Sequence, residues 1–65
     1  MMTNAKRSEW RLSSQYFGDN KLWQVYYLRD VDAVDHAGNR VYAEGIFETR
    51  EEAAELAARL NAAER

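Results

Sequence analysis

The segment at residues 22–28, Leu-Trp-Gln-Val-Tyr-Tyr-Leu, constrains the fold of this chain more than any other stretch. Aromatic and β-branched residues pack well on a pleated surface, and alternate side chains of a strand point to opposite faces. One face receives Trp23, Val25 and Tyr27, and the other receives Gln24, Tyr26 and Leu28. Because an exposed edge of this composition would promote aggregation, we expect the segment to be the central strand of a sheet.

Two further segments show the two-residue period of a half-buried strand. Residues 9–17 alternate apolar with polar side chains and end in Gly18-Asp19-Asn20, a turn signal. Residues 40–47 follow a polar connection with a second turn signal at residues 35–39. In this third strand one face is expected to carry Val41, Ala43, Gly45 and Phe47, and the other Tyr42, Glu44 and Ile46.

The C-terminal part of the chain has the features of a helix that begins after Thr49. Thr49-Arg50-Glu51-Glu52 matches a capping box, in which the threonine oxygen accepts the amide proton of Glu52. The alanine-rich run through Ala63 has a high helix propensity. Its apolar stripe at helical spacing consists of Ala53, Leu56, Ala57 and Leu60.

These elements predict an α+β fold, a three-stranded antiparallel meander with one C-terminal helix packed on one face. The 65 residues suffice for one domain, which we place at residues 9–65, after a disordered tail at residues 1–8. A single core of this size contributes a net stability of only about 3–5 kcal/mol. With no cysteine in the chain, side-chain packing or self-association has to provide that stability.

Composition argues against catalysis, metal binding and membrane insertion. His36 is the only histidine, and it lies in a turn sequence, so we expect no catalytic residue, no enzyme activity, no cofactor and no small-molecule substrate. Asp30, Asp32 and Asp35 do not fit a calcium loop that starts at Asp30, because valines occupy positions 5 and 12, and we expect no metal site. The longest apolar run has four residues and no secretory signal is apparent, so the expected location is cytoplasmic, away from membranes.

The sheet face away from the helix is the most informative surface that the sequence predicts. It would combine apolar and aromatic side chains with a few polar neighbours, and the candidate interaction residues are Tyr26, Leu28, Tyr42, Ile46, Arg11 and Gln24. Because the chain has one helix for two sheet faces, this cluster would be partly exposed. An exposed apolar patch is typical of a partner surface. The alternative is an ordinary solvated face on which the tyrosines provide cross-strand packing.

The element order resembles the arm-type DNA-binding domains at the N-termini of phage integrases, and also short bacterial proteins built as three strands and a helix. The resemblance covers residues 22–60 and depends on two motifs, Trp23-x-Val25 and Phe47-x-Thr49-x-x-Glu52-Ala53. It implies that the open sheet face enters a DNA groove, with contacts from Arg11, Gln24, Tyr26, Arg29 and Arg40. The chain departs from this pattern at Glu44, near the centre of the same face.

The charge of the chain favours a protein partner over DNA. Residues 1–29 carry five Lys and Arg against two Asp and Glu, whereas residues 30–65 carry four against nine, and the formal net charge is −2. A net acidic protein is a poor match for a polyanion. The expected function is therefore a small non-enzymatic module that binds a protein partner, or itself as a homodimer, through the open sheet face; the alternative is an accessory DNA-binding protein that uses the same face.

Overall fold

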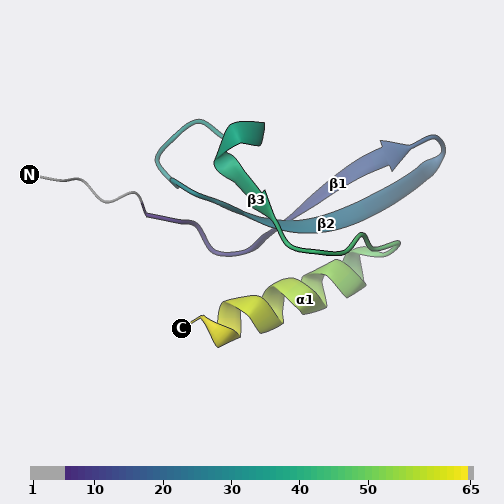
Figure 1. Cartoon of the computed structure of the whole chain (residues 1–65). Coiled ribbons are helices and arrows are strands. Elements are labelled where there is room, and N and C mark those ends of the chain that lie inside the picture. The colour runs from purple at the N-terminus through teal and green to yellow at the C-terminus, as the bar shows by residue number, and fades with distance from the viewer. Residues whose placement is uncertain (1–5, 65) are drawn as a thin grey trace, which may run out of the picture.

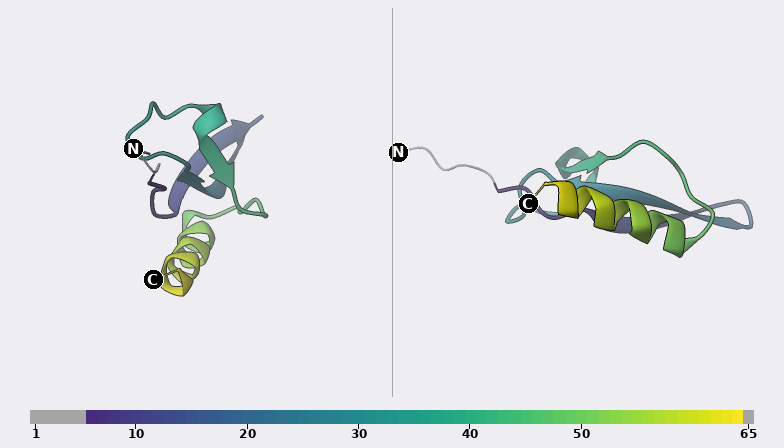
Figure 2. Two further views of the ribbon diagram at one scale, coloured as in Figure 1. Left: turned by 60° about the vertical axis from the view of Figure 1, so that its left-hand side comes forward. Right: turned by 90° about the horizontal axis from the view of Figure 1, so that it is seen from below.

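The computed structural model describes residues 6–64, and these residues form the predicted α+β arrangement. The strands β1 (Arg11–Phe17), β2 (Asn20–Leu28) and β3 (Arg40–Tyr42) make one antiparallel sheet in the order β1-β2-β3. A short 3-10 turn, η1 (Ala37–Asn39), precedes β3, and the helix α1 (Arg50–Ala63) follows it. Figures 1 and 2 show α1 lying along one face of the sheet, as the sequence predicts.

The β1–β2 hairpin closes through a two-residue turn. Phe17 pairs with Asn20, which leaves Gly18 and Asp19 as the central residues. Gly18 has a φ of +66°, and within residues 6–64 only glycines have a positive φ, so the turn follows the type II′ pattern with glycine at its first central position. The right-handed twist of this turn type matches that of the strands, and both strands run to its ends.

The third strand is shorter than the predicted residues 40–47 because a bulge interrupts it. Ala43 N–H still donates to Val25 O at 2.8 Å, and Phe47 exchanges two backbone hydrogen bonds with Trp23 at 2.7 and 2.8 Å. The three residues 44–46 therefore lie opposite the single residue Gln24. Gly45, at the centre of this bulge, has a φ of +110° and is exposed, so it does not face the helix as expected.

The core between α1 and the sheet is small and contains the predicted residues. Val25, Ala53 and Ala57 are buried, and Val25 is completely inaccessible. Partly buried side chains surround them: Trp10, Leu12, Trp23, Ala43, Phe47, Leu56 and Leu60. Alanines on the facing side of α1 let the helix approach the sheet closely, while the aromatic side chains fill the periphery.

Both ends of α1 are held by side-chain hydrogen bonds. Thr49 Oγ1 accepts the N–H of Glu52 at 3.2 Å and donates its hydroxyl proton to Glu52 Oε1 at 3.0 Å, a variant of the predicted capping box. Near the other end, Asn61 Oδ1 accepts the backbone N–H of Trp10 at 2.7 Å, and Asn61 Nδ2 donates to Trp10 O at 3.2 Å. The asparagine amide thus pairs with the peptide groups of Trp10 and attaches α1 to the start of β1.

The expectation of a disordered tail through residue 8 is wrong for residues 6–8, and residues 1–5 lie outside the described part of the chain. Lys6 O accepts the N–H of Val31 at 2.7 Å, and Ser8 N–H donates to Leu28 O at 2.9 Å. The guanidinium of Arg7 lies 3.7 Å from the centre of the Tyr27 ring and forms an ion pair with Glu64 at 3.0 Å. Residues 6–8 lie alongside the end of β2. Their sequence has no alternating apolar pattern, and polar contacts hold them in place.

Candidate functional site

The register places three of the predicted interaction residues in one row across the open face. Tyr26 in β2 lies opposite Arg11 in β1 and opposite Tyr42 in β3. The Tyr26 and Tyr42 rings are 5.7 Å apart between centroids. Gln24 lies on the same face two residues away, where it accepts a hydrogen bond from Gln15 Nε2 at 3.3 Å.

The prediction that Tyr26 would be part of an exposed cluster is wrong, because only 6% of Tyr26 is exposed. The covering group is the guanidinium of Arg40, which lies 4.3 Å from the centre of the Tyr26 ring. A cation stacked on a tyrosine face is attracted by the negative charge density of the ring. Arg40 therefore forms a lid over the central strand, and the centre of the open face is polar.

Three side chains accept hydrogen bonds from the Arg40 guanidinium. Its Nε and Nη2 donate to the two carboxylate oxygens of Asp35 at 2.7 and 3.1 Å, a bidentate pair. Its Nη1 donates to the Tyr42 hydroxyl at 3.1 Å and, in a longer contact of 3.4 Å, to Ser13 Oγ on β1. Hydrogen bonding from Arg40 holds the pKa of Asp35 below its ordinary value, and the same bond raises the pKa of Arg40.

Leu28 is the second predicted interaction residue that the structure buries, with 3% of its surface exposed. Its backbone N–H donates to Ser8 Oγ at 2.8 Å, and the polar connection between β2 and β3 begins at the next residue. The N-terminal segment and this connection enclose the end of β2. Sequence periodicity misses both, because neither has a repeating apolar pattern.

Asn39 organises the connection that covers this end of the sheet. It is a buried polar residue, and its amide oxygen accepts the N–H of Asp30 at 3.0 Å. Its amide nitrogen donates to the carbonyl oxygens of Asp30 and Val34 at 2.9 and 3.2 Å. One side chain thus satisfies three backbone groups of the loop, which fixes the position of Asp35 relative to Arg40.

Tyr42 and Ile46 are the predicted apolar residues that stay on the surface, at 39% and 56% exposure. Tyr42 lies at the end of β3, whereas Ile46 lies in the bulge and outside the strand. The six predicted residues therefore do not form a continuous exposed apolar platform.

The most exposed aromatic side chains of the sheet are two that the sequence did not single out. Tyr16 and Phe17, at the end of β1, are 71% and 51% exposed. The hairpin extends beyond the beginning of α1 in Figures 1 and 2. A comparison of lengths indicates this overhang, since the nine residues of β2 span about 30 Å at 3.3 Å per residue and the fourteen of α1 about 21 Å at 1.5 Å per residue.

The outer edge of β1 is a second surface that the sequence did not single out. In an antiparallel ladder alternate residues direct their backbone groups toward the partner strand, and the close pair Phe17–Asn20 assigns the odd-numbered residues of β1 to β2. The even-numbered residues face outward. Asn61 pairs with the outward groups of Trp10, but no described residue pairs with those of Leu12, Ser14 and Tyr16.

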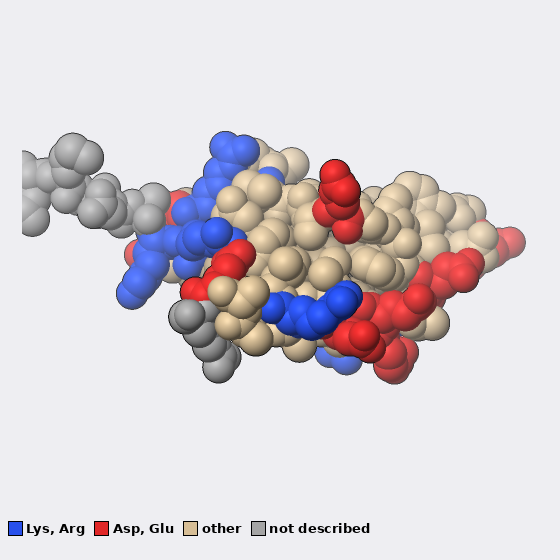
Figure 3. All heavy atoms as spheres, turned by 60° about the horizontal axis from the view of Figure 1, so that its bottom comes forward, with Lys and Arg blue, Asp and Glu red and all other residues tan. Residues whose placement is uncertain are grey.

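Charged side chains are separated on the helix side of the molecule (Figure 3). Basic groups gather near the N-terminal segment, where Arg7 lies, and acidic groups gather where α1 begins, with Glu51 and Glu52 in its first turn. Basic side chains also lie beside the acidic group, and acidic side chains beside the basic group, so the separation is partial.

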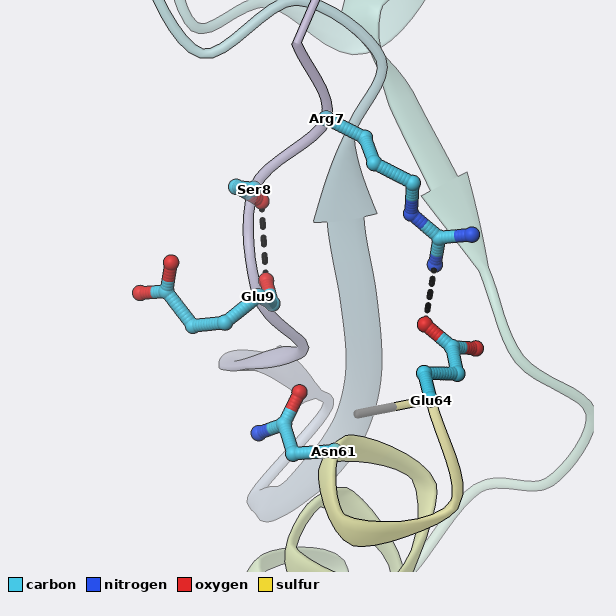
Figure 4. A pocket seen from close by; sticks show the side chains of 5 residues that line it. All are labelled: Arg7, Ser8, Glu9, Asn61 and Glu64. Carbon is cyan, nitrogen blue, oxygen red and sulfur yellow. Dashed lines mark hydrogen bonds and ion pairs between the residues drawn. The ribbon is translucent and has the colours of Figure 1, made fainter.

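A polar cavity of about 360 Å³ lies between the N-terminal segment and the end of α1 (Figure 4). The residues that line it are Arg7, Ser8, Glu9, Asn61 and Glu64. Their polar groups are engaged with protein partners: Glu64 bridges Arg7 and Trp10 Nε1, and Glu9 accepts from Arg11 Nε at 3.1 Å. The hydrogen bonds of Glu9 with its own backbone and with Arg11 lower the pKa of its carboxyl group. These contacts connect the N-terminal segment with the end of α1, so the polar side chains around the cavity have a structural role.

The single histidine and the aspartates of the loop make local contacts. No cluster of three His, Asp or Glu side chains within residues 6–64 is arranged to hold a metal ion. His36 Nδ1 accepts the N–H of Gly38 at 3.0 Å and caps η1. Asp30 Oδ1 accepts the N–H of Asp32 at 3.0 Å, a turn contact.

No protein family, curated protein or solved structure matches this chain. In the part of the chain that the structure describes, no helix has the length and apolar character needed to span a membrane.

Proposed function

We propose that this chain is a small non-enzymatic interaction module that binds a protein partner, a second copy of itself included, through its sheet. The observation that carries the proposal is the exposure of Tyr16 and Phe17 where the hairpin extends past α1. Exposed apolar groups that gather on one part of a surface are typical of partner sites, and tyrosine and phenylalanine are enriched in the cores of such sites. The binding surface accordingly lies nearer to the hairpin end than the sequence suggested, and Tyr42 and Ile46 are secondary candidates.

Site-specific photocrosslinking in cells tests this proposal. Tyr16 is replaced by p-benzoylphenylalanine, which keeps an aromatic side chain at the exposed position. The matched control carries the same residue at Val34, which is 75% exposed in the connection between β2 and β3. We expect a discrete covalent adduct from position 16 and none from position 34. Equal labelling at both positions, or no adduct at position 16, would contradict the proposal.

The alternative function is accessory DNA binding through the open face, as the resemblance to integrase arm domains implies. The basic end seen in Figure 3 and the exposed Arg29 favour it. Two other candidate contacts are less available, since Arg11 is paired with Glu9 at 3.1 Å and Arg40 with Asp35 at 2.7 Å. A phosphate would have to compete with these carboxylates.

Duplex binding at two salt concentrations tests the alternative. Phosphate contacts release counterions, so the affinity of a DNA-binding protein falls steeply as salt increases. The matched variant is Arg29→Gln, which removes an exposed cation from the end of β2. Weak binding at low salt that is lost in this variant would favour DNA binding, whereas no binding at low salt would exclude it.

A further inference from the structure

We infer that the partner of the β1 edge is a second copy of this chain, which pairs antiparallel with it about a two-fold axis at Ser14. The inference rests on the proposed function and names the partner for the same hairpin surface. It starts from the unpaired backbone groups of Leu12, Ser14 and Tyr16, which present three N–H and three C=O groups along the free edge. A row of such groups is a template for another strand.

The composition of this edge lacks the usual protection against strand pairing. Edge strands commonly carry lysine, proline or an inward-pointing charge that prevents association with other chains. The stretch from Leu12 to Phe17, Leu-Ser-Ser-Gln-Tyr-Phe, has no charge, no proline and no glycine. Residues 12–17 therefore carry nothing that would repel an identical strand, and the one charge of β1 is on Arg11 at its beginning.

Two features of the fold select one register. Trp10 cannot extend the pairing because Asn61 occupies its outward N–H and C=O groups at 2.7 and 3.2 Å. Gly18 ends the strand at the other side because it forms the turn. Only an axis at Ser14 pairs all three free residues, with Ser14 opposite its own copy and Leu12 opposite Tyr16 of the second chain. That register forms about six new backbone hydrogen bonds.

The same register covers both exposed aromatic side chains. On the helix side of the sheet, Tyr16 lies beside Leu12 of the second copy, at the separation of directly opposed residues. On the open side, Phe17 lies opposite Arg11 of the second copy, where an aromatic ring and a guanidinium attract each other. A single strand pairing thus accounts for the free edge and for the exposure of Tyr16 and Phe17 in the monomer.

The first experiment measures association and amide exchange on the intact chain. Because the contact is small, sedimentation is followed up to about 1 mM, the range that reveals weak complexes. We expect the mass to approach twice 7.6 kDa, and the amides of Leu12, Ser14 and Tyr16 to become protected as the concentration rises. A monomer at every concentration, with these three amides exchanging freely, would overturn the inference.

Substitutions at Ser14 separate the edge from the fold. Ser14→Pro removes an N–H that points away from β2, so the β1–β2 ladder keeps its hydrogen bonds while dimer pairing is lost. Ser14→Lys brings two ammonium groups together at the axis and should weaken association at least tenfold, with partial recovery at high salt. Ala58→Lys, on the exposed face of α1, adds the same charge away from the edge and should leave association unchanged. Equal loss in the two lysine variants would contradict the assigned edge.

A cysteine at the axis gives a direct geometric test in a chain that has no other cysteine. The Cα atoms of an antiparallel hydrogen-bonded pair are about 5.5 Å apart, within the range that a disulfide spans. Mild oxidation of Ser14→Cys should therefore yield a covalent dimer that Ala58→Cys does not form. If oxidation links neither variant while benzoylphenylalanine at position 16 captures a different protein, the homodimer is wrong and the interaction module remains.

Discussion

At the scale of single residues, Arg40 determines what the open face presents. Its guanidinium covers Tyr26 at 4.3 Å and bonds Asp35, and this bond lowers the pKa of the Asp35 carboxyl from its ordinary 3.8. A group whose folded pKa is depressed stabilises the fold above its unfolded pKa, and this stabilisation is lost as the pH falls through the folded pKa. Arg40→Met keeps an apolar side chain over the ring but removes the hydrogen bonds. We predict that the substitution returns the pKa of Asp35 toward 3.8, as measured by NMR titration of the carboxyl group.

The control for this prediction is Arg29→Met, which removes an exposed arginine eleven positions earlier in the chain. It should leave the titration of Asp35 unchanged. The unfolding free energy of the unmodified chain should also decrease with acidification below about pH 4 more steeply than that of Asp35→Asn, since only the former has this carboxylate to protonate. Identical Asp35 titrations in the unmodified chain and Arg40→Met would show that the bidentate pair does not persist in solution.

At the scale of elements, the bulge at residues 44–46 keeps the end of the third strand in register. Gly45 has a φ of +110°, and a Cβ atom built there would lie 3.1 Å from Phe47 Cζ. We predict that Gly45→Ala lowers the unfolding free energy by about 2 kcal/mol, because a sparsely populated backbone region and a close contact are both imposed. Gly18→Ala is the matched control: its φ is +66°, but nothing lies within 4 Å of the added carbon, so its cost should be about 1 kcal/mol. Chemical denaturation measures both, and an equal cost would mean that Phe47 does not constrain the bulge.

The same element shows where sequence patterns predict this fold and where they do not. Alternation assigned Trp23 and Val25 to the helix side correctly, and local capping chemistry located Thr49 at the start of α1. Periodicity does not detect an insertion of two residues, because the positions on either side keep the same alternation. The bulge at Gly45 was therefore missed, while Phe47 still reached the core side.

The candidate surface was less predictable than the fold, because the residues that cover it come from different segments. Asp35 lies in a loop, Arg40 in β3 and Ser13 in β1, and no local pattern indicates that one guanidinium contacts both of the others. The alternation of side chains along the strand placed Tyr26 on the correct face. Its exposed surface, however, depends on which other segments cover that face. The overhang of Tyr16, in contrast, could have been inferred by comparing the lengths of the strand and the helix.

At the scale of the whole molecule, the proposed self-association would add to the limited stability that the small core provides. Val25 is the single fully buried large side chain among the described residues, and one core in a chain of this size provides only about 3–5 kcal/mol. A complex that forms only from folded chains stabilises them by mass action, so the unfolding temperature rises with protein concentration. A tenfold increase in concentration well above the dissociation constant adds about 0.7 kcal/mol per chain, half of the 1.4 kcal/mol of a tenfold change, because two chains share each contact.

We predict an upward shift of a few degrees per tenfold concentration step for the unmodified chain, since about 1 kcal/mol moves the midpoint of a domain this size by 4–8 °C. Differential scanning calorimetry should show no such shift for Ser14→Pro, and a shift of the same size in that variant would place the stabilising contact somewhere other than the β1 edge.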